Sequence, residues 1–272
     1  MRTVTDLKEI QDLAVEIFTS FKQCCEHYDL KYFLAYGTLI GAIRHHGFIP
    51  WDDDIDVWMP REDFDKLCQV FPEWEGGIRH YINCAVRTPG YDRIHAQICA
   101  SRTSLNMYGR KPSYKEGYFI DVFPIDGLPS NKTARSLRLT HLQLLKNVGT
   151  MYSYDSNSKG FKNRLLFIGS LVFKGIDIQK VMLRYEKIAR KTGVKSDGYV
   201  QIPYVNTGGR NMVLPAAFFS EGTTCEFENM ECSIPKHFDE ILHAIYGDYM
   251  TLPPAEKRVP HHHFDLLIEE EE

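Results

Sequence analysis

Residues 52–59 place four aspartates at the start of an apolar segment, and this pattern restricts the fold more than any other feature of the 272-residue chain. Successive side chains of a β-strand point to opposite faces of the sheet. If residues 54–59 form a strand, Asp54 and Asp56 share one face, and the alternating apolar residues pack into a core on the other. The segment therefore predicts a half-buried strand whose polar face carries two carboxylates.

The spacing of these carboxylates suits a divalent cation. Their Cα atoms would lie roughly 7 Å apart, from a rise of about 3.3 Å per residue. Both could then ligate one Mg²⁺ or Mn²⁺ ion, or a close pair of ions, which would offset the repulsion between them. An exposed acidic turn remains an alternative, although the apolar alternation disfavours it. An EF-hand loop is excluded, because Val57 and Asp63 stand where that loop needs Gly and Glu.

The segment before the aspartates predicts a phosphate site. Residues 31–36 have the composition of a short strand, and a helical pattern begins near Thr38. Gly37 allows the backbone to approach a ligand closely, and a helix N-terminus offers free N–H groups to phosphate. Thr38 can add a hydroxyl donor, and Arg44 lies two turns further on. Gly-Thr alone is equally typical of a structural turn, but beside the aspartates it predicts a combined phosphate and metal site.

A third carboxylate is expected from residues 117–125, which read as another strand. Phosphoryl transfer often uses such a carboxylate as a metal ligand or a base. Asp121 interrupts an apolar run, where a lone charge is costly unless it is paired or bound to a metal. Asp126 precedes Gly127 and reads more simply as a turn residue. We therefore assign the third carboxylate to Asp121.

The rest of the chain alternates between strand and helix patterns, which leaves the α/β and α+β classes open. Further helices are expected at residues 5–28, 61–71, 131–154, 161–174, 176–192 and 236–250. Further strands are expected at residues 79–86, 94–101, 199–205 and 225–235.

Charge and cysteine content narrow the class of protein. A net charge of −4 argues against a general nucleic-acid-binding protein. The seven cysteines include no C-x-x-C pair, and we expect them to be reduced and mostly buried, as in the cytoplasm. The polar N-terminus predicts no secretory signal. We therefore expect a cytoplasmic protein.

One basic segment stands out from this acidic chain. Residues 132–195 hold 14 Lys and Arg against 3 Asp and Glu. Within them, residues 159–174 combine basic side chains with a bulky apolar run, which suits a helix lying on an anionic membrane surface. Packing of the apolar run inside a helical subdomain is the alternative.

Three blocks of the sequence resemble the LicD family of phosphotransferases: residues 32–64, 117–129 and 245–264. This family is part of the nucleotidyltransferase-fold group, which includes the fukutin-related transferases. The resemblance implies an α+β fold with a nucleotidyltransferase-like mixed-sheet core, flanking helices and an added helical subdomain. It implies a catalytic core at 1–130, a basic helical subdomain at 131–195, and a C-terminal part at 196–272 that completes the catalytic domain.

The pattern of the group is a Gly-Ser or Gly-Thr step, an Asp-x-Asp strand and a later strand carboxylate. Gly37 and Thr38 match the first element, Asp54 and Asp56 the second, and Asp121 the third. The resemblance thus implies that the three aspartates are catalytic and hold Mg²⁺ or Mn²⁺, with the Gly-Thr step binding substrate.

Further substrate-binding residues follow from the same resemblance. Asp52 matches an acidic position of the fukutin-like branch, and Arg44 follows the Gly-Thr step. Arg258, His261 and His262 lie in the third block, and we expect them to bind the donor phosphate.

The best-known family members transfer phosphocholine from CDP-choline to a sugar hydroxyl of a bacterial surface glycan, such as a teichoic acid precursor. The resemblance implies this activity here, with a lipid-linked acceptor and peripheral contact with the inner face of the membrane. Transfer of another phospho-alditol, a phospho-sugar or a whole nucleotidyl group stays open, as does a catalytically dead glycan-binding scaffold.

Choline binds to aromatic faces. The candidates are Tyr108, Tyr114, Tyr118, Tyr152 and Tyr154, for which core packing is the alternative.

Overall fold

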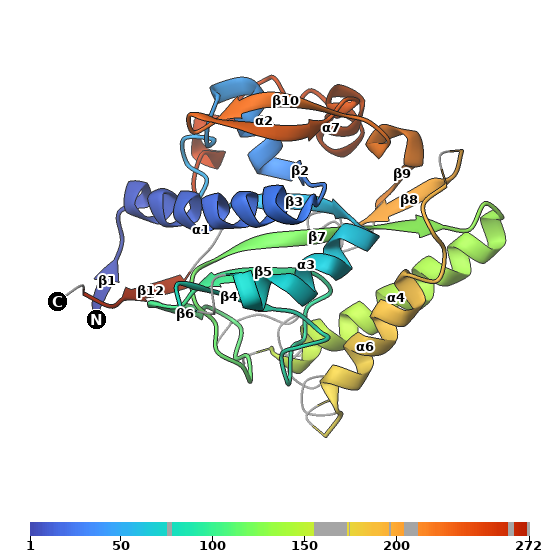
Figure 1. Cartoon of the computed structure of the whole chain (residues 1–272), viewed down its shortest axis with the longest axis horizontal. Helices are drawn as coiled ribbons and strands as arrows, with labels where there is room; N and C mark the ends of the chain where they lie inside the picture. Colours follow the sequence, from blue (N-terminus) through green and yellow to red (C-terminus); the bar gives the residue numbers. More distant parts are fainter. Residues whose placement is uncertain are drawn as a thin grey trace.

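Strand β3 (Asp56–Pro60) continues the aspartate-rich segment and lies inside the main sheet of the protein (Figure 1). The computed structural model describes residues 1–74, 78–154, 173, 175–195, 197–203, 212–260 and 264–270. In these residues the main sheet has the strand order β2-β3-β7-β5-β4, and β8 and β9 extend it from β7. Strands β3 and β7 are parallel, whereas β2, β5 and β4 pair antiparallel with their neighbours. The prediction of an α+β fold with a mixed sheet is confirmed.

The elements of the main sheet and the helices that cover it follow in chain order. They are α1 (Leu7–Tyr28), β2 (Phe33–Leu34), α2 (Tyr36–His45), α3 (Arg61–Trp74), β4 (His80–Asn83), β5 (Ala96–Ala100), β7 (Phe119–Leu128), β8 (Tyr199–Ile202) and β9 (Met212–Pro215). Helices α1 and α3 pack together against β7 and its neighbours. In α1 the buried residues recur at helical spacing, as the sequence predicts, and the side chain of Asp6 caps its N-terminus.

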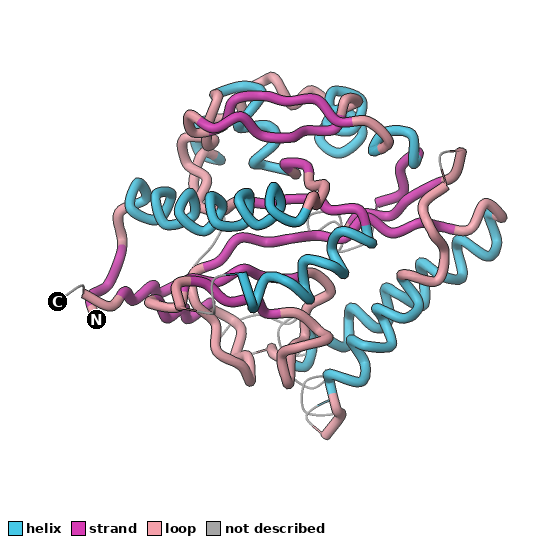
Figure 2. Tube along the Cα trace, viewed as in Figure 1, coloured by secondary structure: helices cyan, strands magenta, loops and turns pink. Residues whose placement is uncertain are grey.

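Two smaller sheets complete the fold (Figure 2). Strands β1 (Arg2–Val4), β12 (Phe264–Ile268) and β6 (Thr103–Met107) bring the two ends of the chain together. Strands β10 (Gly222–Phe227) and β11 (Met230–Pro235) form a hairpin beside α2. The sequence suggested one strand here, but Glu228 and Asn229 both have positive φ, which makes the two-residue turn of a hairpin.

The remaining short elements frame the hairpin and the C-terminal segment. They are η1 (Ala216–Phe219), α7 (Phe238–Tyr246) and η2 (Ala255–Lys257).

Helices α4 (Lys132–Tyr152) and α6 (Ile178–Ala189) pack side by side away from the hairpin (Figure 1). Leu142, Met182 and Tyr185 form an apolar cluster with Tyr91 of the core. The predicted helix at 161–174 and most of the predicted membrane-facing segment lie outside the described residues. Where the chain is described, no helix is both long enough and apolar enough to cross a membrane.

Two predictions about single segments are corrected by the structure. Strand β3 begins at Asp56 rather than at residue 54, so Asp54 precedes the strand that it was expected to share. Asp126 is not a turn residue: it lies in β7 with 1% of its surface exposed, and it pairs with Arg61. The expectation for the cysteines is confirmed, since all seven are free and six are buried.

Candidate active site

The register between β3 and β7 places two of the predicted carboxylates side by side. Asp56 is the direct partner of Asp121 in the parallel pair. The backbone N–H of Asp121 donates to the carbonyl of Ile55 at 3.0 Å, which holds this register. Neighbouring strands are about 4.8 Å apart, and residues at the same register in a parallel pair project to the same face. The two aspartates therefore start from adjacent positions on one face of the sheet.

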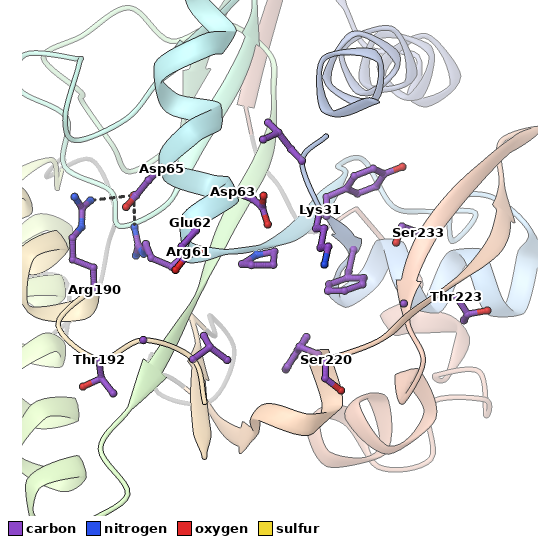
Figure 3. Close-up of a pocket in the computed structure, with 18 of the residues that line it drawn as sticks. Lys31, Arg61, Glu62, Asp63, Asp65, Arg190, Thr192, Ser220, Thr223 and Ser233 are labelled. Atoms are coloured by element: carbon purple, nitrogen blue, oxygen red, sulfur yellow. Dashed lines mark hydrogen bonds and ion pairs between the residues drawn. The ribbon is translucent and has the colours of Figure 1, made fainter. Parts of the chain in front are cut away.

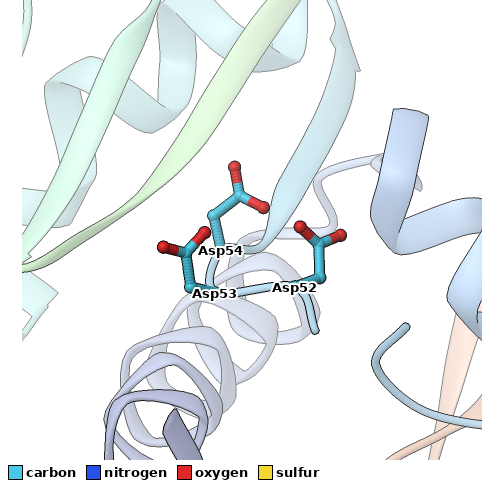
Figure 4. A group of neighbouring side chains, drawn as sticks. All are labelled: Asp52, Asp53 and Asp54. Carbon is cyan, nitrogen blue, oxygen red and sulfur yellow. The ribbon is translucent and has the colours of Figure 1, made fainter. Parts of the chain in front are cut away.

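The aspartates before β3 form a second carboxylate group. Asp52, Asp53 and Asp54 have carboxylate oxygens that all lie within 4.8 Å of one another (Figure 4). Asp52 and Asp53 are buried, and the hydroxyl of Tyr118 donates to the backbone carbonyl of Asp53 at 2.5 Å. Within the described part of the chain, this is the carboxylate trio that lies within metal-ligand spacing. Carboxylate oxygens are the ligands that Mg²⁺ and Mn²⁺ prefer, so the donor set fits such an ion.

A pocket of about 700 Å³ joins these carboxylates to the rest of the predicted site. Asp52, Asp54, Asp56 and Asp121 line it together with Gly37 and Arg44. The facing wall comes from the C-terminal part of the chain, between residues 246 and 257. A volume of this size is typical of small-molecule sites.

The Gly-Thr step positions the acidic segment. A Cβ on Gly37 would lie 2.7 Å from the Oδ2 atom of Asp52, so only Gly lets this carboxylate pack on the start of α2. Thr38 is 2% exposed, and its Oγ1 accepts a hydrogen bond from the backbone N–H of Asp56 at 2.9 Å. Gly37 therefore lines the pocket, while Thr38 fixes the start of β3.

Tyr36, just before this step, has a left-handed backbone with φ of 44°, which is rare for a bulky residue. Its hydroxyl donates to the carbonyl of Pro203, and its ring packs against Trp58 and Phe123 with centroid distances of 4.8 and 5.3 Å. These contacts hold the strained conformation at the edge of the pocket, where strain of this kind often accompanies function.

The two paired aspartates have opposite pKa shifts. Burial, and then the charges of Asp54 and Asp121, raise the pKa of Asp56 well above its usual value. Burial alone would also raise the pKa of Asp121, but the ion pair with His95 and the charge of Arg93 lower it to about 2. Asp121 is thus held as a carboxylate, whereas the charge on Asp56 is unfavourable until a cation joins the site.

His95 and Gln97 are site residues that the sequence analysis missed. The Nε2 atom of His95 lies 3.2 Å from Oδ1 of Asp121, and the side-chain amide of Gln97 donates to the same oxygen at 3.0 Å. Both bind Oδ1, which leaves Oδ2 as the oxygen to meet a ligand. The alternation of polar and apolar residues over 95–98 was the available signal, since it places His95 and Gln97 on one face.

Cationic side chains lie at the rim of the pocket. Arg44 donates from Nη1 to the carbonyl of Tyr249 at 2.8 Å, and the guanidinium of Arg258 lies 5.8 Å from the ring centre of Trp51. Burial, and then the nearby Arg258, lower the pKa of Arg44. Two guanidinium groups that repel each other favour an anion between them. The predicted residues His261 and His262 lie outside the described residues.

Aromatic side chains line this pocket, but they differ from the five tyrosines that the sequence analysis proposed. The described lining residues of this type are Tyr36, Trp51, Phe123, Tyr246 and Tyr249. Tyr108 instead bonds Asp265 on the surface, and Tyr114 packs against Tyr91. Aromatic faces beside Asp248, which also lines the pocket, could hold a cationic head group.

The raised pKa of Asp56 predicts how pH changes the effect of a metal on stability. The unfolded side chain ionises near its ordinary pKa of ~3.9, whereas the folded one stays protonated to higher pH. Unfolding then releases a proton, so the metal-free protein loses stability as pH rises above about 4. Bound Mn²⁺ favours the ionised form and opposes this loss. The rise in Tm with Mn²⁺ over EDTA is expected to grow as pH rises from about 4 toward neutral.

Asp121 does not disturb this measurement. Its pKa is lowered to about 2, so the stability that it contributes is lost only as pH falls from about 4 toward that value. A rise in Tm with Mn²⁺ that is the same at every pH in the window would contradict the prediction. The variant Asp56→Asn is the control, since it has no proton to lose there.

Comparison with known proteins agrees with this geometry. The profile of the LicD/FKTN/FKRP nucleotidyltransferase domain matches residues 29–137. The chain is 31% identical over 269 residues to the lipopolysaccharide cholinephosphotransferase LicD of Haemophilus influenzae. The aligned region covers 94% of this chain and 96% of that protein. An uncharacterized protein of Rickettsia prowazekii is 47% identical over 47 residues, which are 17% of this chain and 18% of that protein. An uncharacterized protein of Rickettsia typhi is 38% identical over 65 residues, which are 22% of this chain and 21% of that protein.

Proposed function

Because the chain belongs to the LicD family, we propose that it is a metal-dependent phosphotransferase that moves phosphocholine from CDP-choline to a sugar hydroxyl of a cell-surface glycan. The observation that carries this proposal is the pocket that combines four aspartates, two arginines at its rim and an aromatic wall. Carboxylates would serve a cation, guanidinium groups a pyrophosphate, and aromatic faces a quaternary ammonium.

Asp54, Asp56 and Asp121 are the metal ligands proposed from the family pattern, and all three line the pocket. Asp54 also belongs to the trio with Asp52 and Asp53 whose oxygens lie within 4.8 Å of one another, and that trio is the alternative ligand set. Bound Mg²⁺ or Mn²⁺ would neutralise charge on the donor pyrophosphate and on the departing CMP. The low pKa of Asp121 suits a ligand better than a base, because a carboxylate that binds protons so weakly is a poor acceptor near neutral pH.

Donor phosphates are assigned to the cationic rim and to Gly37, whereas Thr38 is buried against the start of β3 and does not line the pocket. Arg44 and Arg258 would contact the pyrophosphate, with Lys257 from the same wall. Gly37 offers close backbone approach at the N-terminus of the ten-residue helix α2. His261 and His262 stay proposed phosphate ligands from the family motif.

In the proposed reaction the oxygen of an acceptor hydroxyl attacks the phosphorus of the phosphocholine group. The bond from that phosphorus to the CMP oxygen breaks, and CMP leaves with the electron pair. The hydroxyl proton passes to a base or to water. One phosphodiester bond is formed and one pyrophosphate bond is broken.

The acceptor class is proposed from the named relative. The Haemophilus influenzae protein is named for lipopolysaccharide, so we propose a glycan of that type first and a teichoic acid-type precursor second. A lipid-linked acceptor and a CDP-activated donor would place the reaction at the inner face of the cell membrane. The basic segment at 159–174 stays a proposed contact with anionic lipid.

Product analysis tests the proposed function. The protein is incubated with Mn²⁺, a glycan acceptor and each of CDP-choline, CDP-ethanolamine, CDP-glycerol and CDP-ribitol in turn. We expect CMP release with CDP-choline and phosphocholine on the glycan. CMP retained on the product would show nucleotidyl transfer instead. No turnover of any donor, together with no calorimetric binding of Mn²⁺ or donor, would indicate a catalytically dead scaffold.

A further inference from the structure

A second pocket, of about 880 Å³, lies at the other end of β3 from Asp56 (Figure 3). Four stretches of the chain form it, together with Ser233 of β11. Residues 30–33 and 60–65 come from the main sheet and α3, residues 190–194 follow α6, and residues 219–224 lead into the hairpin. It shares no lining residue with the carboxylate pocket.

The walls of this pocket are held in place by close backbone packing. A Cβ on Gly127 would lie 2.5 Å from the carbonyl oxygen of Thr192, so the loop after α6 rests directly on β7. A Cβ on Gly222 would lie 3.1 Å from the ring of Phe33, so the start of β10 rests on β2. Because both walls are held by these close contacts, the cavity cannot easily collapse, and it is formed before any ligand binds.

The charges that line the pocket balance. The positive residues are Lys31, Arg61 and Arg190, and the negative residues are Glu62, Asp63 and Asp65. Arg61 and Arg190 are already paired, since both contact Asp65, at 3.4 and 3.1 Å (Figure 3). Arg61 Nε also lies 2.6 Å from Asp126. A phosphate would find few unpaired cations here, and a cation would find no surplus of carboxylates. The lining therefore favours a neutral ligand.

Hydroxyl and aromatic side chains complete the lining. Eleven of the nineteen lining residues are charged, Ser or Thr, so every stretch of the lining offers polar groups to a ligand. Ser220, Thr223 and Ser233 can both donate and accept hydrogen bonds, as sugar hydroxyls do. Phe33 and Phe219 also line the pocket, but they are 4% and 8% exposed and belong to the core, so the hydroxyl groups are the side chains that can contact a ligand. The combination fits a neutral polyhydroxylated ligand.

A single buried ring links this pocket to the carboxylate pocket. Tyr36 lines the carboxylate pocket and packs edge-on against Trp58 with a centroid distance of 4.8 Å. Phe219 lines the second pocket and packs edge-on against the same indole at 5.6 Å. The buried indole of Trp58 therefore forms part of the wall between the two pockets.

We propose that the second pocket binds a neutral sugar unit of the acceptor glycan, away from the sugar that receives the phosphoryl group. The proposal rests on the proposed function for the identity of the acceptor. It assigns the pocket to acceptor recognition, while the aspartates and arginines carry the chemistry. Such a site lowers KM for a long acceptor and has no effect on an acceptor of one sugar.

Filling the pocket with a large side chain tests the proposal. Ser220 and Thr223 are exposed lining residues, so Ser220→Trp and Thr223→Trp can each occupy the cavity without disturbing a core. Ser104→Trp, at an exposed strand position outside the pocket, is the matched control. The full chain is assayed with Mn²⁺, CDP-choline and oligosaccharides released from the envelope glycan of its own organism.

With the long oligosaccharide, each pocket variant is expected to raise the acceptor KM about tenfold, the scale of one good contact site, with kcat and the KM for CDP-choline unchanged. With a methyl glycoside of the receiving sugar alone, the variants and the wild type should agree. Ser104→Trp should match the wild type with both acceptors. Equal effects on both acceptors, or none, would overturn the proposal.

A binding measurement separates this proposal from the proposed function. Saturation-transfer NMR reports contact of the oligosaccharide with the protein without turnover. Transfer to the wild-type protein that is lost in Ser220→Trp and kept in Ser104→Trp supports the sugar site, even if no CDP donor reacts. An oligosaccharide that binds all three proteins alike, or none of them, overturns it.

Discussion

Replacement of Asp56 by Asn is expected to abolish phosphotransfer and to stabilise the metal-free protein at the same time. The loss of a charged ligand should lower kcat by roughly 10³-fold or more, the scale on which charged groups act in phosphoryl transfer. Burial and the charges of Asp54 and Asp121 make the Asp56 carboxylate unfavourable without a cation. A neutral amide removes that repulsion, so Tm in EDTA near neutral pH should rise.

Asp121→Asn separates the two effects. Its activity should fall on the same scale, but its stability should fall as well, because the ion pair with His95 and the hydrogen bond from Gln97 lose their charged acceptor. Asp12→Asn, on the exposed face of α1, is the control for a charge change alone. Full activity of Asp56→Asn with donor and Mn²⁺ saturating would contradict the assignment of this residue.

Replacement of Arg61 by Met is expected to cost about 3–5 kcal/mol of unfolding free energy, the usual result of breaking a buried ion pair from one side. The guanidinium lies 2.6 Å from both Asp126 and Glu186, and both carboxylates are buried. Met fills much of the same volume but leaves these two charges without their main partner. Urea denaturation measures the loss.

Arg190 provides the matched comparison, because it contacts the same Glu186 from a position where 38% of its side chain is exposed. Arg190→Met should cost about 1 kcal/mol or less, as surface pairs do. Neutralising the partners should restore much of the loss, so Arg61→Met with Asp126→Asn and Glu186→Gln should be more stable than Arg61→Met alone. Equal costs for the two Arg variants would rule out this account of the network.

Local patterns predicted the parts of the site that lie close together in the sequence. The helical spacing of apolar residues in α1 is a property of a short segment and appears in the structure. The predicted half-buried strand is wrong, because Val57, Trp58 and Met59 of β3 are all buried and both faces of the strand are covered. The position of Asp121 followed from the cost of a charge in an apolar strand, and its register beside Asp56 is what the fold adds.

The missed features depend on contacts between distant segments. Asp126 resembles a turn residue beside Gly127, and its burial in β7 is explained by its bonds to Arg61, 65 positions earlier, and to Gln201. His95 and Gln97 gain their meaning from Asp121 on the neighbouring strand. Likewise, Asp54 lies outside β3, because the pairing of β3 with β2 and β7 begins at residue 56 or later. The alternation of side chains in the sequence does not reveal where this pairing begins.

The carboxylate pocket is assembled from two stretches of sequence that can change independently. Gly37, Asp56 and Asp121 fall within the segment 29–137 that the family profile matches, whereas Tyr246 and Lys257 of the facing wall lie far beyond it. Mutation can therefore change the C-terminal wall of the pocket while the carboxylates stay fixed. A relative that matches only the first stretch shares the segment with the carboxylates and can face them with a different wall.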